Sequence, residues 1–325
     1  VQWISQTSPT AFPLFDVHMI SSTDGWAVGG PFPFGMAGPM GSSIFHWDGT
    51  HWFHYETLPS PNTLWGVYML NTNDGWAVGS SADGGPPVIL RWNGVAWTVV
   101  TPPGVALGGT LMDVHAVSAT EAWAVGFIPD VPAPILKWDG SIWTSVPSGT
   151  EDDTVLTDVH MLSSTDGWAV GCTNIFCTVP VILHWNGLAW SSVTAPIPPI
   201  VPDSEAIAGL LDVYMLSPTD GWAVGSIAED DQGTIIHWDG VQWRRVPAPA
   251  GAFLTSVHMV SANDGWTVGF DTGAVLSLLV HWNGLTWDVV STPPIPTTMN
   301  NILTSVYMVS ALDGWAVSGF SFVAG

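Results

Sequence analysis

A six-residue phrase, Asp-Gly-Trp-Ala-Val-Gly, returns seven times along the chain in nearly the same form. Its tryptophans are separated by 50, 47, 45, 54, 44 and 49 residues, which is the length of one supersecondary unit. Such spacing predicts an array of similar units within the 325 residues, and not several unrelated domains. The copies are Asp24–Gly29, Asp74–Gly79, Glu121–Gly126, Asp166–Gly171, Asp220–Gly225, Asp264–Gly269 and Asp313–Ser318.

Each unit carries the pattern of four β-strands. Before the phrase comes an alternating apolar stretch such as Asp158–Leu162, and after it comes a Trp-Asp/Asn-Gly-x-x-Trp phrase such as Trp185–Trp190. Asn-Gly and Asp-Gly pairs favour two-residue type I′ hairpin turns, which would place Trp282 opposite Leu285. Four antiparallel strands repeated radially form a propeller blade. We therefore predict an all-β fold, a seven-bladed β-propeller of four-stranded antiparallel blades.

The two ends of the chain are predicted to share the last blade. Val1-Gln2-Trp3 matches Val241-Gln242-Trp243, a fourth strand, so the N-terminal strand would close the ring. The expected third strand of that blade is incomplete. Either Phe320–Ala324 serves as a shortened strand, or a neighbouring copy donates one, or truncation has removed it. The single domain 1–325 would then contain blades at about 14–56, 64–101, 111–147, 155–194, 210–247, 253–291, and 302–325 plus 1–6.

Tryptophan dominates the expected core. Twenty of the 21 tryptophans occupy repeat positions, and only Trp65 does not. Large rings at fixed positions of every unit favour packing of blade against blade over ligand stacking. The structural repeat core is expected at Trp26, Trp76, Trp123, Trp168, Trp222, Trp266 and Trp315.

The repeated phrases also carry a family resemblance. Ser-Ser-Thr-Asp-Gly-Trp-Ala-Val-Gly followed by Trp-Asp-Gly-x-x-Trp resembles the Asp-box class of propeller repeats, in particular photosystem II assembly-factor-like propellers and exported bacterial relatives. The resemblance covers essentially the whole chain and implies architecture more than activity. Sialidases share the Asp box and use an arginine triad with a Tyr/Glu pair. This chain has three arginines, two of them adjacent (Arg244 and Arg245), so that triad cannot be mapped.

Composition narrows the possible partners. Four basic and 27 acidic residues give a net charge of −23, which would repel nucleic acid. Only 10% of residues are charged and the mean hydropathy is +0.33, yet no apolar run is long enough to span a membrane. A weakly charged surface favours burial in an assembly. The start at Val1 suits either a processed, exported protein or a fragment.

Three groups of residues are candidates for special chemistry. Cys172 and Cys177 are expected to form a disulfide, with free thiols as the alternative. Eight of ten histidines occupy two repeat positions, where Tyr, Arg and Lys substitute, so we expect structural hydrogen bonds to neighbouring blades and to the turn aspartates. The acidic loops Glu151–Asp153 and Glu229, Asp230 and Asp231 favour solvated charge, with weak calcium binding at the second as the alternative. No other cofactor, metal site or catalytic residue is expected.

The predicted function is non-enzymatic: an extracellular or cell-surface scaffold subunit that assembles with copies of itself into a filament or surface layer, with strand donation as one way of linking. The alternative is a glycan- or peptide-binding module that uses one face or the central channel, and an enzyme ranks third. Apolar loops and chain ends are the expected sources of assembly contacts. The candidate contacts are Phe32, Phe34, Met36, Met40, Val1, Trp3, Phe320 and Phe322.

Overall fold

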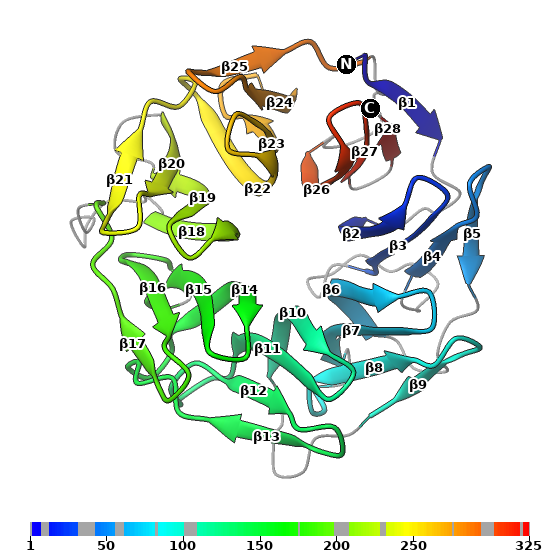
Figure 1. Ribbon diagram of the computed structural model, residues 1–325, viewed down its shortest axis with the longest axis vertical. Helices are drawn as coiled ribbons and strands as arrows, with labels where there is room; N and C mark the ends of the chain where they lie inside the picture. The colour runs from blue at the N-terminus through cyan, green and yellow to red at the C-terminus, as the bar shows by residue number, and fades with distance from the viewer. Residues whose placement is uncertain are drawn as a thin grey trace.

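The computed structural model describes residues 2–7, 13–31, 43–55, 62–81, 84–100, 109–174, 176–197, 208–227, 232–274, 276–293, 302–318 and 321–324. Its regular elements are all β-strands, and within these ranges no helix is long and apolar enough to cross a membrane. The strands form seven four-stranded antiparallel blades in a ring around a central channel (Figure 1). This architecture confirms the all-β propeller that the repeat predicts.

Six blades follow one another along the chain, each with its first strand innermost and its fourth outermost (Figure 1). The first blade contains β2 (Leu14–Ser21), β3 (Asp24–Gly29), β4 (Ser43–Trp47) and β5 (Trp52–Tyr55). The second contains β6 (Asn62–Asn71), β7 (Asp74–Ser81), β8 (Val88–Trp92) and β9 (Trp97–Val99). The third contains β10 (Thr110–Ser118), β11 (Glu121–Phe127), β12 (Ile135–Trp138) and β13 (Trp143–Val146). The fourth blade contains β14 (Val155–Ser163), β15 (Asp166–Cys172), β16 (Pro180–Trp185) and β17 (Trp190–Ser192). The fifth contains β18 (Ala208–Ser217), β19 (Asp220–Ile227), β20 (Gln232–Trp238) and β21 (Trp243–Val246). The sixth contains β22 (Ala252–Ser261), β23 (Asp264–Asp271), β24 (Leu276–Trp282) and β25 (Trp287–Val290).

Both ends of the chain build the seventh blade. Its strand order is β26 (Leu303–Ser310), β27 (Asp313–Ser318), β28 (Ser321–Ala324) and β1 (Ile4–Thr7). The pairing of Ile4 with Ala324 shows that the N-terminal strand closes the ring, as the sequence predicts. The shortened third strand is internal. Because β28 is paired on both of its edges, this blade has no third-strand position left for a neighbouring copy to fill, and that route of strand donation is corrected.

The hairpins between third and fourth strands differ from the predicted two-residue turn. Trp282 lies directly opposite Trp287, so the loop has four residues and the expected pairing of Trp282 with Leu285 is wrong. The Asn283 side chain accepts hydrogen bonds from the backbone N–H groups of Leu285 and Thr286 at 2.9 and 3.0 Å. Only Gly284 has a positive φ, of 90°, whereas a type I′ turn needs two. The two tryptophans still share one face of the blade.

Tryptophans fill the interfaces between blades. Trp123, which is fully buried, contacts Trp185 and Trp190 of the following blade at ring-centroid distances of 4.9 and 5.6 Å. Trp266 is the exception: its tryptophan neighbour in the seventh blade is Trp3, at 5.2 Å. All seven tryptophans of the Gly-Trp phrase are between 0 and 3% exposed. Burial of so much aromatic surface, about 150–250 Å² for each ring, makes these interfaces the core of the fold.

Candidate binding site in the central channel

One aromatic side chain from each innermost strand reaches the central channel. Neighbouring rings lie 4.3 to 4.9 Å apart between centroids, and the series closes on itself. We call these side chains the aromatic ring, and they are His18, Tyr68, His115, His160, Tyr214, His258 and Tyr307. The sequence predicts that they hydrogen-bond to the next blade. Instead the rings pack against one another, and the Nδ1 atoms of His18 and His258 have no hydrogen-bond partner among the described residues.

The aromatic ring carries no charge at neutral pH. Burial lowers the pKa of His18 and His258 to about 3 and that of His160 to about 4, so these imidazoles are neutral. The pKa of His115 is also lowered, by burial and by the neighbouring histidines. Burial raises the pKa of Tyr68 to about 12, and the phenols stay protonated. The channel therefore offers neutral nitrogen and hydroxyl groups at this level.

A second set of polar side chains lies two residues earlier on each innermost strand. We call it the carboxyl ring, and it consists of Asp16, Asp113, Asp158, Asp212, Ser256 and Ser305, with Gly66 at the equivalent position of the second blade. Most members accept a hydrogen bond from the backbone of the following blade. Asp113, Asp158 and Asp212 bind the N–H groups of Val159, Val213 and Val257 at 3.1, 2.9 and 2.8 Å. The carboxyl ring thus ties adjacent blades together around the channel.

Gly66 interrupts the carboxyl ring at the second blade. A Cβ atom at this position would lie 2.9 Å from the Cα of Asp113, which is closer than side-chain atoms normally approach backbone. The backbones of β6 and β10 therefore pass closely here, and glycine is the residue that fits. The missing side chain leaves Asp16 and Asp113 as the nearest carboxyl groups on either side.

The carboxyl groups are half-buried and hold their protons more tightly than free aspartate. Burial raises the pKa of Asp113 to about 7 and that of Asp212 to about 6. The pKa of Asp158 is raised well above its usual value by burial and by the charges of Asp212 and Asp113, and burial also raises that of Asp16. No lysine or arginine appears among the described residues that line the channel to offset this effect.

The two rings enclose a cavity of about 350 Å³. This volume lies near the lower end of the range for small-ligand sites, about 300–1,000 Å³. Within the described part of the chain, no three His, Cys, Asp or Glu side chains have an arrangement that would hold a metal ion. The channel can therefore accept one side chain or a short segment by hydrogen bonding and charge.

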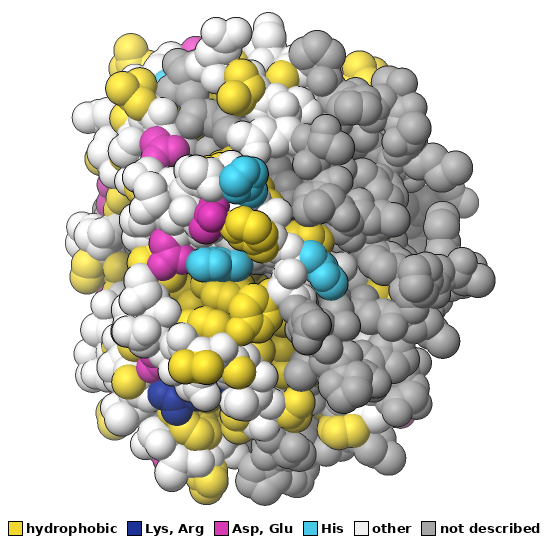
Figure 2. All heavy atoms as spheres, turned by 90° about the vertical axis from the view of Figure 1, so that its right-hand side faces the viewer, with side chains coloured by type: hydrophobic (Ala, Val, Ile, Leu, Met, Phe, Trp, Pro, Cys, Tyr) yellow, Lys and Arg dark blue, Asp and Glu magenta, His cyan; other side chains and the backbone are white. Residues whose placement is uncertain are grey.

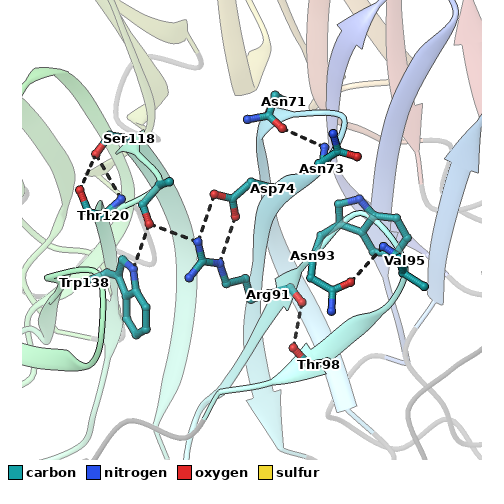
Figure 3. Close-up of polar contacts among 12 residues, drawn as sticks. Asn71, Asn73, Asp74, Arg91, Asn93, Val95, Thr98, Ser118, Thr120 and Trp138 are labelled. Atoms are coloured by element: carbon teal, nitrogen blue, oxygen red, sulfur yellow. Dashed lines mark hydrogen bonds and ion pairs between the residues drawn. The ribbon is translucent and has the colours of Figure 1, made fainter.

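The second group of repeated histidines lies further out and is structural in its contacts. His46, His184, His237 and His281 each place Nε2 2.8 Å from an oxygen of the turn aspartate of their own blade. In the second blade Arg91 replaces histidine, binds Asp74 through two nitrogens at 3.0 and 3.1 Å, and donates to the Ala119 carbonyl of the third blade (Figure 3). These contacts confirm the predicted bonds to the turn aspartates.

The remaining residues that the sequence singles out lie apart from the channel. A disulfide joins Cys172, the last residue of β15, to Cys177 in the segment that follows, with Cα atoms 4.9 Å apart. Trp3, a candidate assembly contact, is only 4% exposed because it packs on Trp266, so that assignment is corrected. Phe322 lies on β28. The other candidates are outside the described residues, namely Val1, Phe32, Phe34, Met36, Met40, Phe320 and the acidic loop Glu229, Asp230 and Asp231.

The acidic loop Glu151–Asp153 hydrogen-bonds to the backbone of a neighbouring loop. The Asp153 side chain accepts a hydrogen bond from the backbone N–H of Asp130 at 2.9 Å. Trp65, the tryptophan outside the repeat positions, stacks on Phe15 at 4.3 Å between the first two blades. Each of these residues has a local packing or hydrogen-bonding role in the structure.

The carboxyl ring was not recognised from the sequence. Its signal is a polar residue two positions before the His/Tyr position in otherwise apolar strands, aspartate in four blades and serine in two. A carboxylate in a strand buried on both sides indicates either a backbone acceptor or a binding site. The spacing of two also places both polar positions on the same side of the strand.

Comparisons with known proteins bear on the fold alone. No family model matches the sequence, and no curated protein matches it. Among solved structures, YCF48 bound to D1 peptide has a TM-score of 0.67 at 16% identity, covering 99% of this chain and 96% of that one. YCF48 from Cyanidioschyzon merolae has a TM-score of 0.66 at 14% identity, covering 100% and 98%. The GH74 xyloglucanase from Xanthomonas campestris has a TM-score of 0.67 at 12% identity, covering 99% of this chain and 53% of that one. The chain shares its β-propeller fold with proteins of diverse function.

Proposed function

We propose that this propeller is a non-enzymatic binding module that holds a short peptide segment in its central channel. The observation that carries the proposal is the closed aromatic ring around a cavity of about 350 Å³, where the Nδ1 atoms of His18 and His258 have no partner in the described part of the chain. Buried polar atoms without partners cost stability, and a ligand that supplies hydrogen bonds would recover that cost. Binding is favoured over catalysis because the carboxyl groups accept backbone hydrogen bonds that fix them in the channel wall.

A peptide suits the channel better than a glycan. Sugars are usually held by stacking on a flat, open aromatic face, whereas each ring here is packed against a neighbour on both sides. Peptides instead need donors and acceptors, which imidazole, phenol and carboxyl groups supply. The propeller YCF48, which this chain resembles in fold, has been solved with a D1 peptide bound. That precedent supports a peptide ligand for this chain.

The test is binding of an arrayed pentapeptide library to the full chain. We expect a subset of peptides to bind the wild type and a control variant equally, the control being Leu188→Ser in an exposed hairpin loop. The same peptides should bind His160→Trp, which fills the channel, at least tenfold more weakly. Selected peptides should also shift the ¹⁵N signals of the channel histidines in the wild type, a readout that needs no variant. Absence of binders, or binders that leave the channel histidines unaffected, would refute the proposal.

Self-assembly remains a second candidate because aliphatic side chains project from one end of the blades. Val95, Leu188, Val241 and Leu285 occupy the same position in the four-residue hairpin loops and are 78 to 89% exposed. Figure 2 shows hydrophobic side chains scattered among uncharged polar ones, with few basic groups. Such a surface favours association of an extracellular scaffold whose Cys172–Cys177 disulfide suits an oxidising compartment. Sedimentation tests this candidate by comparing the wild type with a variant in which all four of these exposed residues are replaced by serine. A monomeric wild type would exclude assembly through these hairpin loops.

A further inference from the structure

We propose that the group recognised in the channel is a cation with N–H donors, the ammonium or guanidinium of a lysine or arginine in the bound peptide. This inference rests on the proposed function and names the specificity of the same site. Two independent features of the described residues carry it: an arc of carboxyl groups with no basic side chain beside it, and buried imidazole nitrogens with no hydrogen-bond partner there.

The carboxyl arc runs over three consecutive blades. Asp113 and Asp212 lie on the blades either side of Asp158, and all three line the channel. Burial and the charges of Asp212 and Asp113 raise the pKa of Asp158. Asp16 faces the same channel beyond Gly66. The four basic side chains are elsewhere. Arg91, Lys137 and Arg244 form ion pairs with Asp74, Glu121 and Asp239, and Arg245 lies on the outermost strand β21. A cation from a ligand would replace the protons on these carboxyl groups with charge-assisted hydrogen bonds.

The imidazole nitrogens provide the second feature. His258 is 7% exposed, lines the channel, and its Nδ1 atom has no partner among the described residues. His18 lies on the other side of Tyr307, and its Nδ1 atom likewise has no partner within the described ranges. The imidazoles of His18 and His258 are both neutral. A ring nitrogen that carries no proton therefore accepts a hydrogen bond from a cation and does not repel it.

The distance between the aromatic ring and the carboxyl ring suits a long basic side chain. Two residues along a strand span about 6–7 Å, which is within the reach of an extended lysine or arginine. A peptide backbone at the level of the aromatic ring can therefore place its ammonium or guanidinium among the carboxyl groups. An acidic side chain would be repelled there, and an aliphatic one would leave the carboxyl groups desolvated.

Calorimetry on the full chain tests the inference with matched peptides. The probes are acetyl-Gly-Gly-X-Gly-Gly-amide, with X as lysine, arginine, norleucine or glutamate, and n-butylammonium as the free amine. We expect the lysine and arginine peptides to bind at least tenfold more tightly than the norleucine peptide, and more tightly at pH 8 than at pH 5. Binding should release protons, measured as a dependence of the heat on buffer ionisation, because the cation displaces protons from Asp113, Asp158 and Asp212.

Variants locate the site. Asp158→Asn and Asp212→Asn should each remove most of the preference for lysine over norleucine, whereas Asp239→Asn, in an exposed turn, should leave it unchanged. Equal binding of norleucine, or tighter binding of glutamate, would overturn the inference and leave the proposed peptide site standing. Failure of every peptide would refute the proposed function as well. Binding of n-butylammonium as tight as the lysine peptide would support the cation but contradict a peptide source.

Discussion

The Asp158 carboxylate accepts a hydrogen bond of 2.9 Å from the backbone N–H of Val213, which belongs to the next blade. Its other neighbours are the carboxyl groups of Asp113 and Asp212. One side chain therefore serves both as a link between blades and as part of the channel wall. Substitutions at this position separate the two roles, because asparagine keeps an oxygen acceptor and loses the ionisable proton.

Asp158→Asn is expected to change the pH dependence of stability. The pKa of Asp158 is raised in the folded state, so the folded protein binds this proton more tightly than the unfolded chain. The wild type consequently loses stability as pH rises from about 4 through the folded pKa, and the variant does not. We expect the variant to gain stability over the wild type at pH 8, relative to pH 4. Urea unfolding at the two pH values measures the difference.

Asp239→Asn is the matched control with the opposite sign. Hydrogen bonds from the Gln242 backbone and the Arg244 side chain lower the pKa of Asp239 to about 2. Its contribution to stability is present above the unfolded pKa and is lost progressively as pH falls from about 4 through the folded pKa of about 2. The variant should therefore lose a little stability at pH 8 and show no gain. A gain at pH 8 in both variants would show that the effect comes from net charge and not from the channel.

Trp123→Ala should strongly destabilise the ring. Trp123 is fully buried, packs on Trp185 and Trp190, and lies under the Lys137 ammonium at 4.7 Å. Loss of a buried tryptophan typically costs about 3–5 kcal/mol. Trp65→Ala, which loses the stack on Phe15 outside the repeat positions, is expected to cost less. Denaturant midpoints of the two variants rank the contributions, and an equal loss would contradict the special role of the repeat tryptophans.

Arg91→His is expected to be tolerated where Arg91→Ala is not. Histidine occupies the equivalent position in four blades and binds the turn aspartate there at 2.8 Å. Alanine would leave the half-buried Asp74 carboxylate without its partner, which costs about 1.5–3 kcal/mol. Thermal unfolding of the two variants compares them directly. Similar melting temperatures would show that the ion pair adds nothing measurable.

Removal of residues 1–7 should open the ring. The deletion takes away β1, which pairs with β28, and Trp3, which packs on Trp266. We expect a loss of at least 3 kcal/mol from the tryptophan alone, together with aggregation through the uncovered edge of β28. Adding the peptide 1–7 in excess should restore part of the stability. Sedimentation and denaturant unfolding of the truncated chain provide the measurements.

The sequence predicted the architecture because the repeat is strong and local. Trp26 and its six equivalents lie where the period places them, and residues 1–7 close the ring as the match to Val241–Trp243 implies. The predicted register of the hairpin was wrong. The Asn283 side chain accepts hydrogen bonds from two backbone N–H groups, and these bonds favour a four-residue loop over the type I′ turn. Competition of this kind between side chain and backbone is not visible in an Asn-Gly pair.

The site was harder to predict because it exists only in the closed ring. His18 and Tyr307 lie 4.6 Å apart although they come from opposite ends of the chain. The first strand of a typical repeat contains one His or Tyr and one Asp or Ser. Taken alone, this pattern predicts an ordinary strand with two polar positions. The interchange of His and Tyr suggested hydrogen bonds between blades, whereas seven-fold geometry brings the rings close enough to pack on one another.

The pairing of Ile4 with Ala324 also has a consequence for folding kinetics. It joins positions separated by almost the whole chain, and closing so large a loop before any other contact forms carries a high entropic barrier. The six continuous blades, each made of neighbouring strands, can form first. We therefore expect the seventh blade, built from both ends of the chain, to assemble last and to open first. Substitutions within it should accelerate unfolding and leave the refolding rate nearly unchanged.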